Sequence, residues 1–555
     1  MVHGGFWDEE KTALNFLHNP RFYETEVIPA FRRKTGKEFH VDEVVEVSTF
    51  EEGLFDSARL NKTVVRDAAK EEVLTFMIKA YYPLRGWSWE NLKRYKDLRV
   101  LTAFQKRKID KQWEQVKKDA ESEREHMEAW NAAGVATPVF LAKVSKETST
   151  FGEYGKTFGH KDMPLEVLVS TFVEGVTQDK DLLFLNQEIQ RLNEGEHTLT
   201  IVRREDNPKK TVQQEIEFLE GKKRQAIMAM LYTASDLSLR VTALIDSDPE
   251  KFKHLKQRTH SYEALMDRLV RHARSYYVWC ALGTPRSKVK LESVRKQKIP
   301  SAIKKKLNQL EKELRDNSNP VSPGVQRITD INRYRYGQRD EYPHNFIFSK
   351  GSIRLFGEGS RSVILDPDKA GLMPPELAKA MILGNNIAML KPEEMFTWYL
   401  ESVEQDRRIV AELQSERFLY RGQVRTDVEK NVSLFAEVLI YELLNRLGTN
   451  ADNHIGGYHH SRFMEILTDE RRGQRFQEYH NPALLGDAYD SVKVSTRPYE
   501  PKVANVFILE ALQGVYELIL ENSKEYLKKE FSKDKKKELR DQMKFLKDKG
   551  LVQWR

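Results

Sequence analysis

A lysine stands within the most strand-like stretch of this chain. Residues 73–81 read Val-Leu-Thr-Phe-Met-Ile-Lys-Ala-Tyr, a run of β-branched, aliphatic and aromatic residues that is typical of a buried strand. An ammonium group in such surroundings is costly unless an anion lies beside it. Lys79 therefore predicts a fold in which a carboxylate from another element, or a bound anion, meets this strand.

The predicted elements follow the order of strands, a charged helix, strands and then a mostly helical half. Residues 8–33 favour helices, and the stretch 101–133 favours one long charged helix that ends at Gly134. Five strands are expected, at 41–47, 54–60, 73–81, 137–141 and 165–173. Beyond 375 the pattern is again helical, and a charged helix is expected from Lys533 onward.

The charged helix contains a candidate partner for the strand lysine. Glu123 is followed four and seven residues later by Met127 and Trp130, so the three side chains share one helical face. A carboxylate on an otherwise apolar face is the group expected to pair with Lys79. A lysine on a strand, paired to a helix glutamate, is one of the fixed parts of phosphoryl-transfer sites that hold a nucleotide.

Three further polar residues occur in the order that phosphoryl transfer requires. Asp340 is followed five positions later by Asn345, and Asp366 comes directly after the apolar run Val363–Leu365. One carboxylate can orient or deprotonate an acceptor hydroxyl, while an amide oxygen and a second carboxylate hold Mg²⁺ against the triphosphate. An ordinary polar turn beside Pro343 is the alternative explanation of this spacing.

These motifs resemble those of the protein-kinase-like superfamily, in particular the divergent branch containing RIO kinases and aminoglycoside phosphotransferases. The helix that ends in Ala-Gly-Val-Ala-Thr-Pro at residues 133–138 resembles the helix of that branch that ends in an Ala-Gly-Val/Ile-x-x-Pro turn, and Val167–Gly175 resembles its hinge strand. Gln338-Arg339-Asp340 is similar to its catalytic loop. Asp366-Pro367-Asp368 stands where its metal-binding Asp is found. The resemblance covers about residues 41–370, with a break between 176 and 330.

The resemblance implies an α+β, two-lobed kinase-like fold with a β-rich first lobe, a helical second lobe and extra helical segments. It implies ATP and Mg²⁺ as cofactors, and phosphoryl transfer to a hydroxyl of an unidentified acceptor. In that scheme Lys79 holds the nucleotide phosphates and Glu123 fixes Lys79. Asp340 is the catalytic base or orienting carboxylate, and Asn345 and Asp366 bind the metal.

The same comparison divides the chain into four parts: a helical extension (1–40), the first lobe and hinge (41–175), the second lobe with a helical insertion over about 176–330 (176–400), and additional helices (401–555). Two departures from the family pattern are evident. The stretch Ser48–Gly53 contains one glycine where a glycine-rich phosphate loop is expected, and Gln338 replaces the usual histidine.

Composition limits the class of protein. The 555 residues carry 91 basic and 84 acidic side chains, so a net charge of +7 is a small excess that does not by itself indicate a nucleic-acid partner. The single cysteine, Cys280, excludes an intrachain disulfide. The N-terminus lacks the layout of a signal peptide, and no uncharged apolar run is long enough to span a bilayer. A cytoplasmic protein without a membrane partner is the simple expectation.

Three alternatives remain open at this stage. The chain could be a catalytically weak kinase-like scaffold that binds a protein partner through its insertion and C-terminal helices. The basic segment 286–315 could bind nucleic acid, although its interspersed Glu311 and Glu313 also fit a solvated helix. Arg421 and the pair Ser495-Thr496 resemble elements of ADP-ribosyltransferases, but the Glu-x-Glu motif of that family does not follow them.

Overall fold

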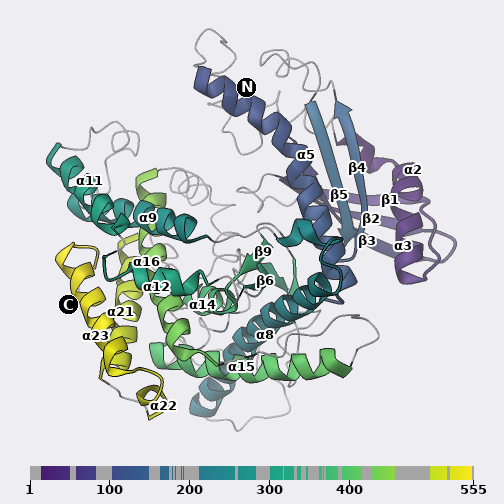
Figure 1. Ribbon diagram of the computed structural model, residues 1–555. Helices are drawn as coiled ribbons and strands as arrows, with labels where there is room; N and C mark the ends of the chain where they lie inside the picture. The colour runs from purple at the N-terminus through teal and green to yellow at the C-terminus, as the bar shows by residue number, and fades with distance from the viewer. Residues whose placement is uncertain are drawn as a thin grey trace. The chain divides into compact units, whose positions relative to one another are not determined.

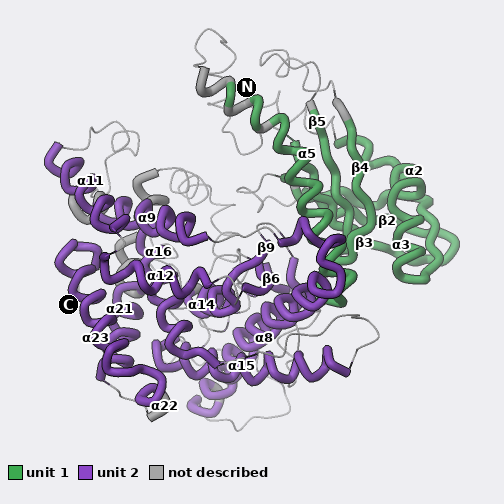
Figure 2. Tube along the Cα trace, viewed as in Figure 1, with its two compact units in different colours: residues 1–174 green, residues 175–555 purple. Residues whose placement is uncertain are grey.

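In the computed structural model the chain divides into two compact units, residues 1–174 and 175–555 (Figures 1 and 2). The structure describes residues 14–49, 58–82, 103–148, 163–173, 212–256, 261–282, 301–316, 318–330, 334–338, 345–347, 362–365, 370–385, 390–415, 430–456, 501–521 and 525–552, with the single positions 178, 182, 185, 189, 192, 367 and 428.

A five-stranded antiparallel sheet forms the centre of the first unit. Its strands are β1 (Glu43–Thr49), β2 (Ala58–Asp67), β3 (Glu72–Tyr81), β4 (Phe140–Thr148) and β5 (Met163–Thr171), in the order β1-β2-β3-β5-β4. The alternation of side chains along β3 sends Phe76, Ile78 and Ala80 to one face of the sheet and Lys79 and Tyr81 to the other. The strand that carries the lysine is therefore central, with a neighbour on each side.

Helix α5 (Ala103–Ala132) lies against the face of the sheet that carries Lys79 (Figure 1). Ala120 and Met127 of the helix pack with Tyr81 and Leu168 in one buried cluster. The helix ends at Gly134, whose φ of 71° is the left-handed conformation that glycine adopts most readily. This turn leads the chain directly into β4.

Short helices from the start of the chain cover the opposite face of the sheet. The 3₁₀ turn η1 (Asn15–His18), α2 (Pro20–Phe22), the π-helical turn η2 (Tyr23–Val27) and α3 (Ile28–Thr35) follow one another there. Tyr23 stacks on Phe76 with ring centroids 6.0 Å apart. Ile28 and Phe31 belong to the same buried cluster as Phe76 and Val167. The sheet is thus enclosed between two helical layers.

The second unit consists mainly of helices. They are α8 (Val212–Ser247), η4 (Lys253–Lys256), α9 (Tyr262–Leu282), α11 (Ser301–Arg315), α12 (Ser322–Ile328), α14 (Pro375–Asn385), α15 (Pro392–Ser415), α16 (Val432–Gly456), α21 (Pro501–Leu520), α22 (Glu525–Lys528) and α23 (Lys533–Asp548). Helix α16 packs against α9, α14 and α21, so it forms the centre of this unit. The predicted α+β composition, with a sheet early in the chain and helices dominating the rest, is confirmed.

Two small antiparallel ribbons lie among these helices. Strand β6 (Arg335–Gln338) pairs with β9 (Ala370–Met373), and β7 (Phe346–Ile347) pairs with β8 (Val363–Ile364). The described side chains of β6 and β7 are buried. In the sequence, Asp340 comes shortly after β6, Asn345 directly precedes β7, and Asp366 comes shortly after β8.

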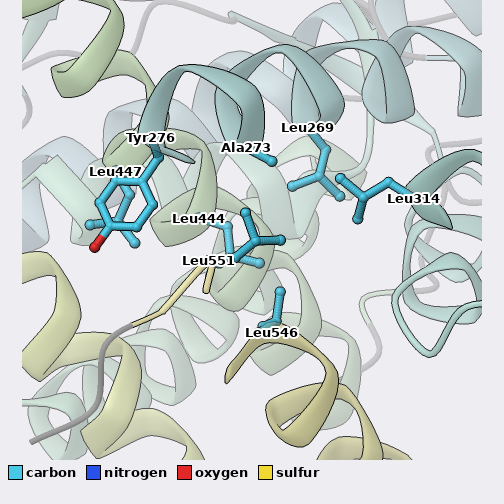
Figure 3. Close-up of a pocket in the computed structure, with 8 residues that line it drawn as sticks. All are labelled: Leu269, Ala273, Tyr276, Leu314, Leu444, Leu447, Leu546 and Leu551. Atoms are coloured by element: carbon cyan, nitrogen blue, oxygen red, sulfur yellow. The ribbon is translucent and has the colours of Figure 1, made fainter. Parts of the chain in front are cut away.

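An apolar cavity in the second unit is too small to be a binding site. Leucines of α9, α11, α16 and α23 line it together with Tyr276, as Figure 3 shows, and its volume is about 10 Å³. A space of that size has room for about one water molecule. We therefore interpret it as a small packing gap in the helical core.

Glycine 448 allows α16 and α9 to approach closely. A Cβ atom at this position would overlap the backbone and side chain of His272 on α9. We therefore expect Gly448→Ala to destabilise the protein by about 1–3 kcal/mol, the usual cost of overpacking a core. Urea unfolding measures the change.

The control for this substitution is Gly221→Ala. Gly221 lies within α8, it is exposed, and a Cβ atom there meets nothing within 4 Å. The greater helix propensity of alanine should stabilise this variant by roughly 0.5–1 kcal/mol. Equal effects of the two substitutions would contradict the close approach at Gly448.

Among the described helices, none is long and apolar enough to cross a membrane. Two predicted strand positions need correction. The second strand is described from Ala58 and extends to Asp67, beyond the predicted end at Leu60, while positions 54–57 lie outside the described residues. The fourth runs from Phe140 to Thr148 instead of 137–141. The fourth strand is an edge strand, where polar side chains such as Lys143 and Lys146 are tolerated and conceal the strand pattern.

Candidate functional site

Lys79 and Glu123 form an ion pair beneath α5. The Nζ atom of Lys79 lies 2.8 Å from Oε2 of Glu123. The lysine side chain is 13% exposed and the glutamate side chain 8%, so both charges are largely removed from water. Breaking a partly buried pair of this kind is costly, because it leaves an uncompensated charge. The structure thus brings together the two predicted nucleotide-binding residues of the first unit.

Tyr81 is a third member of this group that the sequence did not single out. It lies two residues after Lys79 on the same face of β3, and its hydroxyl donates a hydrogen bond to Oε2 of Glu123. The Lys79 ammonium lies 5.4 Å from the centre of the Tyr81 ring. The glutamate therefore accepts hydrogen bonds from two donors on one strand. The two-residue period of a strand was the signal that could have revealed Tyr81.

A second polar cluster lies on the same face of the sheet. Lys143 of β4 contacts Glu121 of α5 at 2.6 Å and Glu166 of β5 at 3.5 Å. The Glu166 side chain is 1% exposed and also accepts a hydrogen bond from the Ser145 hydroxyl at 2.6 Å. A hydrogen bond from Arg124, together with that from Lys143, lowers the pKa of the Glu121 carboxyl to about 2. Glu121 is therefore charged throughout the ordinary pH range.

Strand register places the two clusters side by side. Leu168 of β5 is the cross-strand partner of Lys79 on one side and of Lys143 on the other. Glu166 is likewise the partner of Tyr81 and of Ser145. Directly opposed residues in a sheet share one face. The sheet therefore presents two polar rows to α5, one with two lysines and one with the buried glutamate.

The second unit contains the other predicted residues. Asn345 is 6% exposed and precedes β7, and its carbonyl oxygen accepts a hydrogen bond from the Leu365 amide at 2.9 Å. Asp340 and Asp366 lie outside the described residues. The described residues include no group of three or more metal-ligating side chains. Asn345 is thus the one predicted metal ligand whose surroundings the structure describes.

Hydroxyl groups of α8 hold the segments that lead to these residues. Thr242 accepts a hydrogen bond from the Tyr336 amide of β6 at 3.0 Å. The Thr233 and Ser362 hydroxyl oxygens lie 2.7 Å apart, and Ser362 immediately precedes β8. Buried hydrogen bonds of this kind fix a segment because leaving either partner unsatisfied is costly. Both ribbons are therefore anchored to one long helix.

The basic segment 286–315 is described only from Ser301 onward, where it forms α11. Leu307, Leu310 and Leu314 are buried, while Lys304 to Lys306 are exposed. Glu311 pairs with Arg274 of α9. In its described part the segment is an amphipathic surface helix, and its binding of nucleic acid or a protein partner stays a prediction.

Comparison with known proteins gives weak similarities. No protein-family model and no curated protein matches the chain. A crystal structure from Ralstonia eutropha, assigned by its name to the aminoglycoside phosphotransferases, is 9% identical with a TM-score of 0.34, covering 88% of this chain and 97% of the other.

Two structures of a thermostable mutant of the aminoglycoside phosphotransferase APH(4)-Ia also match. The apo form is 10% identical with a TM-score of 0.28, covering 78% of this chain and 98% of the other. A ternary complex of that enzyme with ADP and hygromycin B is 9% identical with a TM-score of 0.24, covering 78% and 97%. TM-scores this low do not establish a common fold, and no family is assigned from them.

Proposed function

We propose that the chain is an ATP- and Mg²⁺-dependent phosphotransferase of the kinase-like class. It would transfer the γ-phosphate to a hydroxyl of a small molecule or of an unusual macromolecular acceptor. The observation that supports this most directly is the Lys79–Glu123 pair between the central strand β3 and α5. A strand lysine fixed by a helix glutamate is the arrangement that positions nucleotide phosphates in this class of enzyme.

The surroundings of Lys79 fit an anionic ligand. The Lys79 ammonium donates a hydrogen bond to Oε2 of Glu123 at 2.8 Å. Glu123 also accepts a hydrogen bond from Tyr81. If Lys79 turns toward a phosphate, the glutamate therefore keeps a donor. Burial of the pair strengthens its electrostatic effect on a nearby phosphate, because the local dielectric is lower than that of water.

This proposal includes metal ligands and a base from later in the chain. Asn345 and Asp366 would hold Mg²⁺, which neutralises charge on the phosphates when bound. The hydrogen bond from Leu365 to Asn345 supports a shared site, because Asp366 follows Leu365 directly in the chain. Asp340 would orient the acceptor hydroxyl or take its proton. No covalent intermediate is required, so the site works by positioning and charge stabilisation.

The proposed organisation follows the sequence prediction: a helical extension (1–40), a nucleotide-binding lobe and hinge (41–175), a second lobe with an insertion over about 176–330 (176–400), and further helices (401–555). A cytoplasmic location would suit an enzyme that uses ATP.

The roles are tested by ADP release and nucleotide binding in two variants. Asp340→Ala should lower turnover by about 10²–10⁴-fold while Mg²⁺-ATP binding is retained. Asp366→Asn should weaken metal-dependent binding and turnover together. Full turnover of Asp340→Ala would show that the assigned role is wrong.

A second function remains, because Ser48–Gly53 contains a single glycine where backbone amides usually hold the phosphates. In that case the chain is a kinase-like scaffold that binds a protein partner or nucleic acid through its insertion and C-terminal helices. Mg²⁺-ATP binding by the wild type without ADP release, across a panel of hydroxyl acceptors, would favour the scaffold over the enzyme.

A further inference from the structure

We propose that Lys143 is a positioning residue that holds Glu123 against Lys79 by anchoring α5 from the edge strand β4. The proposal rests on the proposed function, because that function gives the Lys79–Glu123 pair its importance. Lys143 lies on the edge strand β4, and its ion pairs are with Glu121 and Glu166 rather than with Lys79 or Glu123.

The Lys79–Glu123 and Lys143–Glu121 ion pairs hold α5 on opposite sides of its axis. Glu121 and Glu123 are two residues apart, which is about 200° around a helix and about 3 Å along it. Their carboxylates therefore diverge to either side of the helix. Glu123 reaches Lys79 on β3, while Glu121 reaches Lys143 on β4, and β5 lies between these two strands. Rotation of α5 about its axis would strain one bridge or the other.

Glu166 of strand β5 holds Lys143 in place. Lys143 lies 3.5 Å from the buried Glu166 carboxylate as well as 2.6 Å from Glu121. Glu166 is further held by the Ser145 hydroxyl. A lysine shared between a buried carboxylate and a helix carboxylate has little freedom to move. The position of Lys143 on the sheet therefore constrains the position of α5.

Two kinds of substitution separate this role from a general effect on folding. Lys143→Met removes the anchor. It also takes the ammonium group away from the buried Glu166 carboxylate, so it could disturb the sheet as well. Glu121→Ala leaves the Lys143–Glu166 contact in place and removes the bridge to Lys143 together with the pair to Arg124 within the helix, and alanine has the highest helix propensity. Arg124→Ala is the matched control, because Arg124 bonds Glu121 and Glu128 within the helix and makes no described contact with the sheet.

The measurement is the rate at which an amine-acylating reagent modifies Lys79, without nucleotide, followed by peptide mass spectrometry. Lys70, whose side chain is 45% exposed in the β2–β3 turn, is the internal reference. The ion pair protects Lys79 from acylation, so Glu123→Ala sets the upper limit. We expect Glu121→Ala to raise labelling of Lys79 about fivefold, a typical size for coupling within one ion-pair network. Lys143→Met should act similarly, and the double variant should add little.

Labelling of Lys79 that is unchanged in Glu121→Ala but raised in Glu123→Ala would overturn the proposal. An equal rise in Arg124→Ala would also overturn it, since the effect would then come from the helix and not from the bridge. A rise in Glu121→Ala alone supports the proposal. If that rise is found in a protein that binds no Mg²⁺-ATP, the anchoring by Lys143 stands and the proposed function fails by itself.

Discussion

Replacing Lys79 with methionine should lower ATP turnover at least about a hundredfold, as removal of a preorganised charge from a site of phosphoryl transfer does. Methionine has a similar length and suits the apolar strand, and Tyr81 still donates a hydrogen bond to Glu123. The buried Glu123 carboxylate loses its counter-charge, so we expect a loss of stability, but the variant should still fold. ADP release under saturating Mg²⁺-ATP measures the rate, and thermal unfolding verifies that the variant is folded.

The matched control is Lys70→Met, which removes a lysine from the same unit at an exposed turn. Its turnover should equal that of the wild type. Glu123→Gln should fall between the two variants, because it keeps Lys79 but loosens its position. A Lys79→Met variant that is folded and turns over ATP like the control would exclude Lys79 from the reaction.

Breaking the buried ion pair of the second unit should have the largest effect on stability. Lys379 of α14 lies 2.6 Å from Asp406 of α15, with the side chains 5% and 8% exposed. We expect Lys379→Met to reduce the free energy of unfolding by about 3–5 kcal/mol, because a buried carboxylate then loses its counter-charge. Chemical unfolding followed by circular dichroism measures the loss.

Two further variants make this prediction specific. Arg407→Met breaks an exposed pair with Glu404 on the same helix and should cost less than about 1 kcal/mol. The double variant Lys379→Met/Asp406→Leu removes both buried charges and should recover much of the lost stability. Equal stability of Lys379→Met and Arg407→Met would contradict the burial of the pair.

Local pattern was sufficient to predict the elements that carry the first half of the site. The apolar run around Lys79 identified β3, and the spacing of Glu123, Met127 and Trp130 identified the inward face of α5. Met127 and Trp130 are indeed buried, at 4% and 0% exposure. Each of these features is determined by residues close together in sequence, so helix and strand periods reveal them.

Cross-strand neighbours could not be predicted in the same way. Lys143 and Glu166 meet because β4 pairs with β5 in one register, and a shift by one residue would turn every side chain to the other face. The sequence between the two strands does not specify that register. In the sequence Lys143 looks like an ordinary polar residue. Its cross-strand pairing with Leu168 shows that it lies on the same face of the sheet as Lys79. The pairing of Asn345 with Leu365 depends likewise on a ribbon whose strands are far apart in sequence.

The measurement that tests the proposed nucleotide site most directly is a thermal shift of the wild type and of Asp366→Asn, with ATP, with and without Mg²⁺. Ligand at about 100 times its dissociation constant stabilises a protein by about 2.7 kcal/mol, which is readily visible. We predict a Mg²⁺-dependent shift in the wild type that is lost in Asp366→Asn. The absence of any shift in the wild type, at millimolar Mg²⁺-ATP, would contradict the nucleotide site.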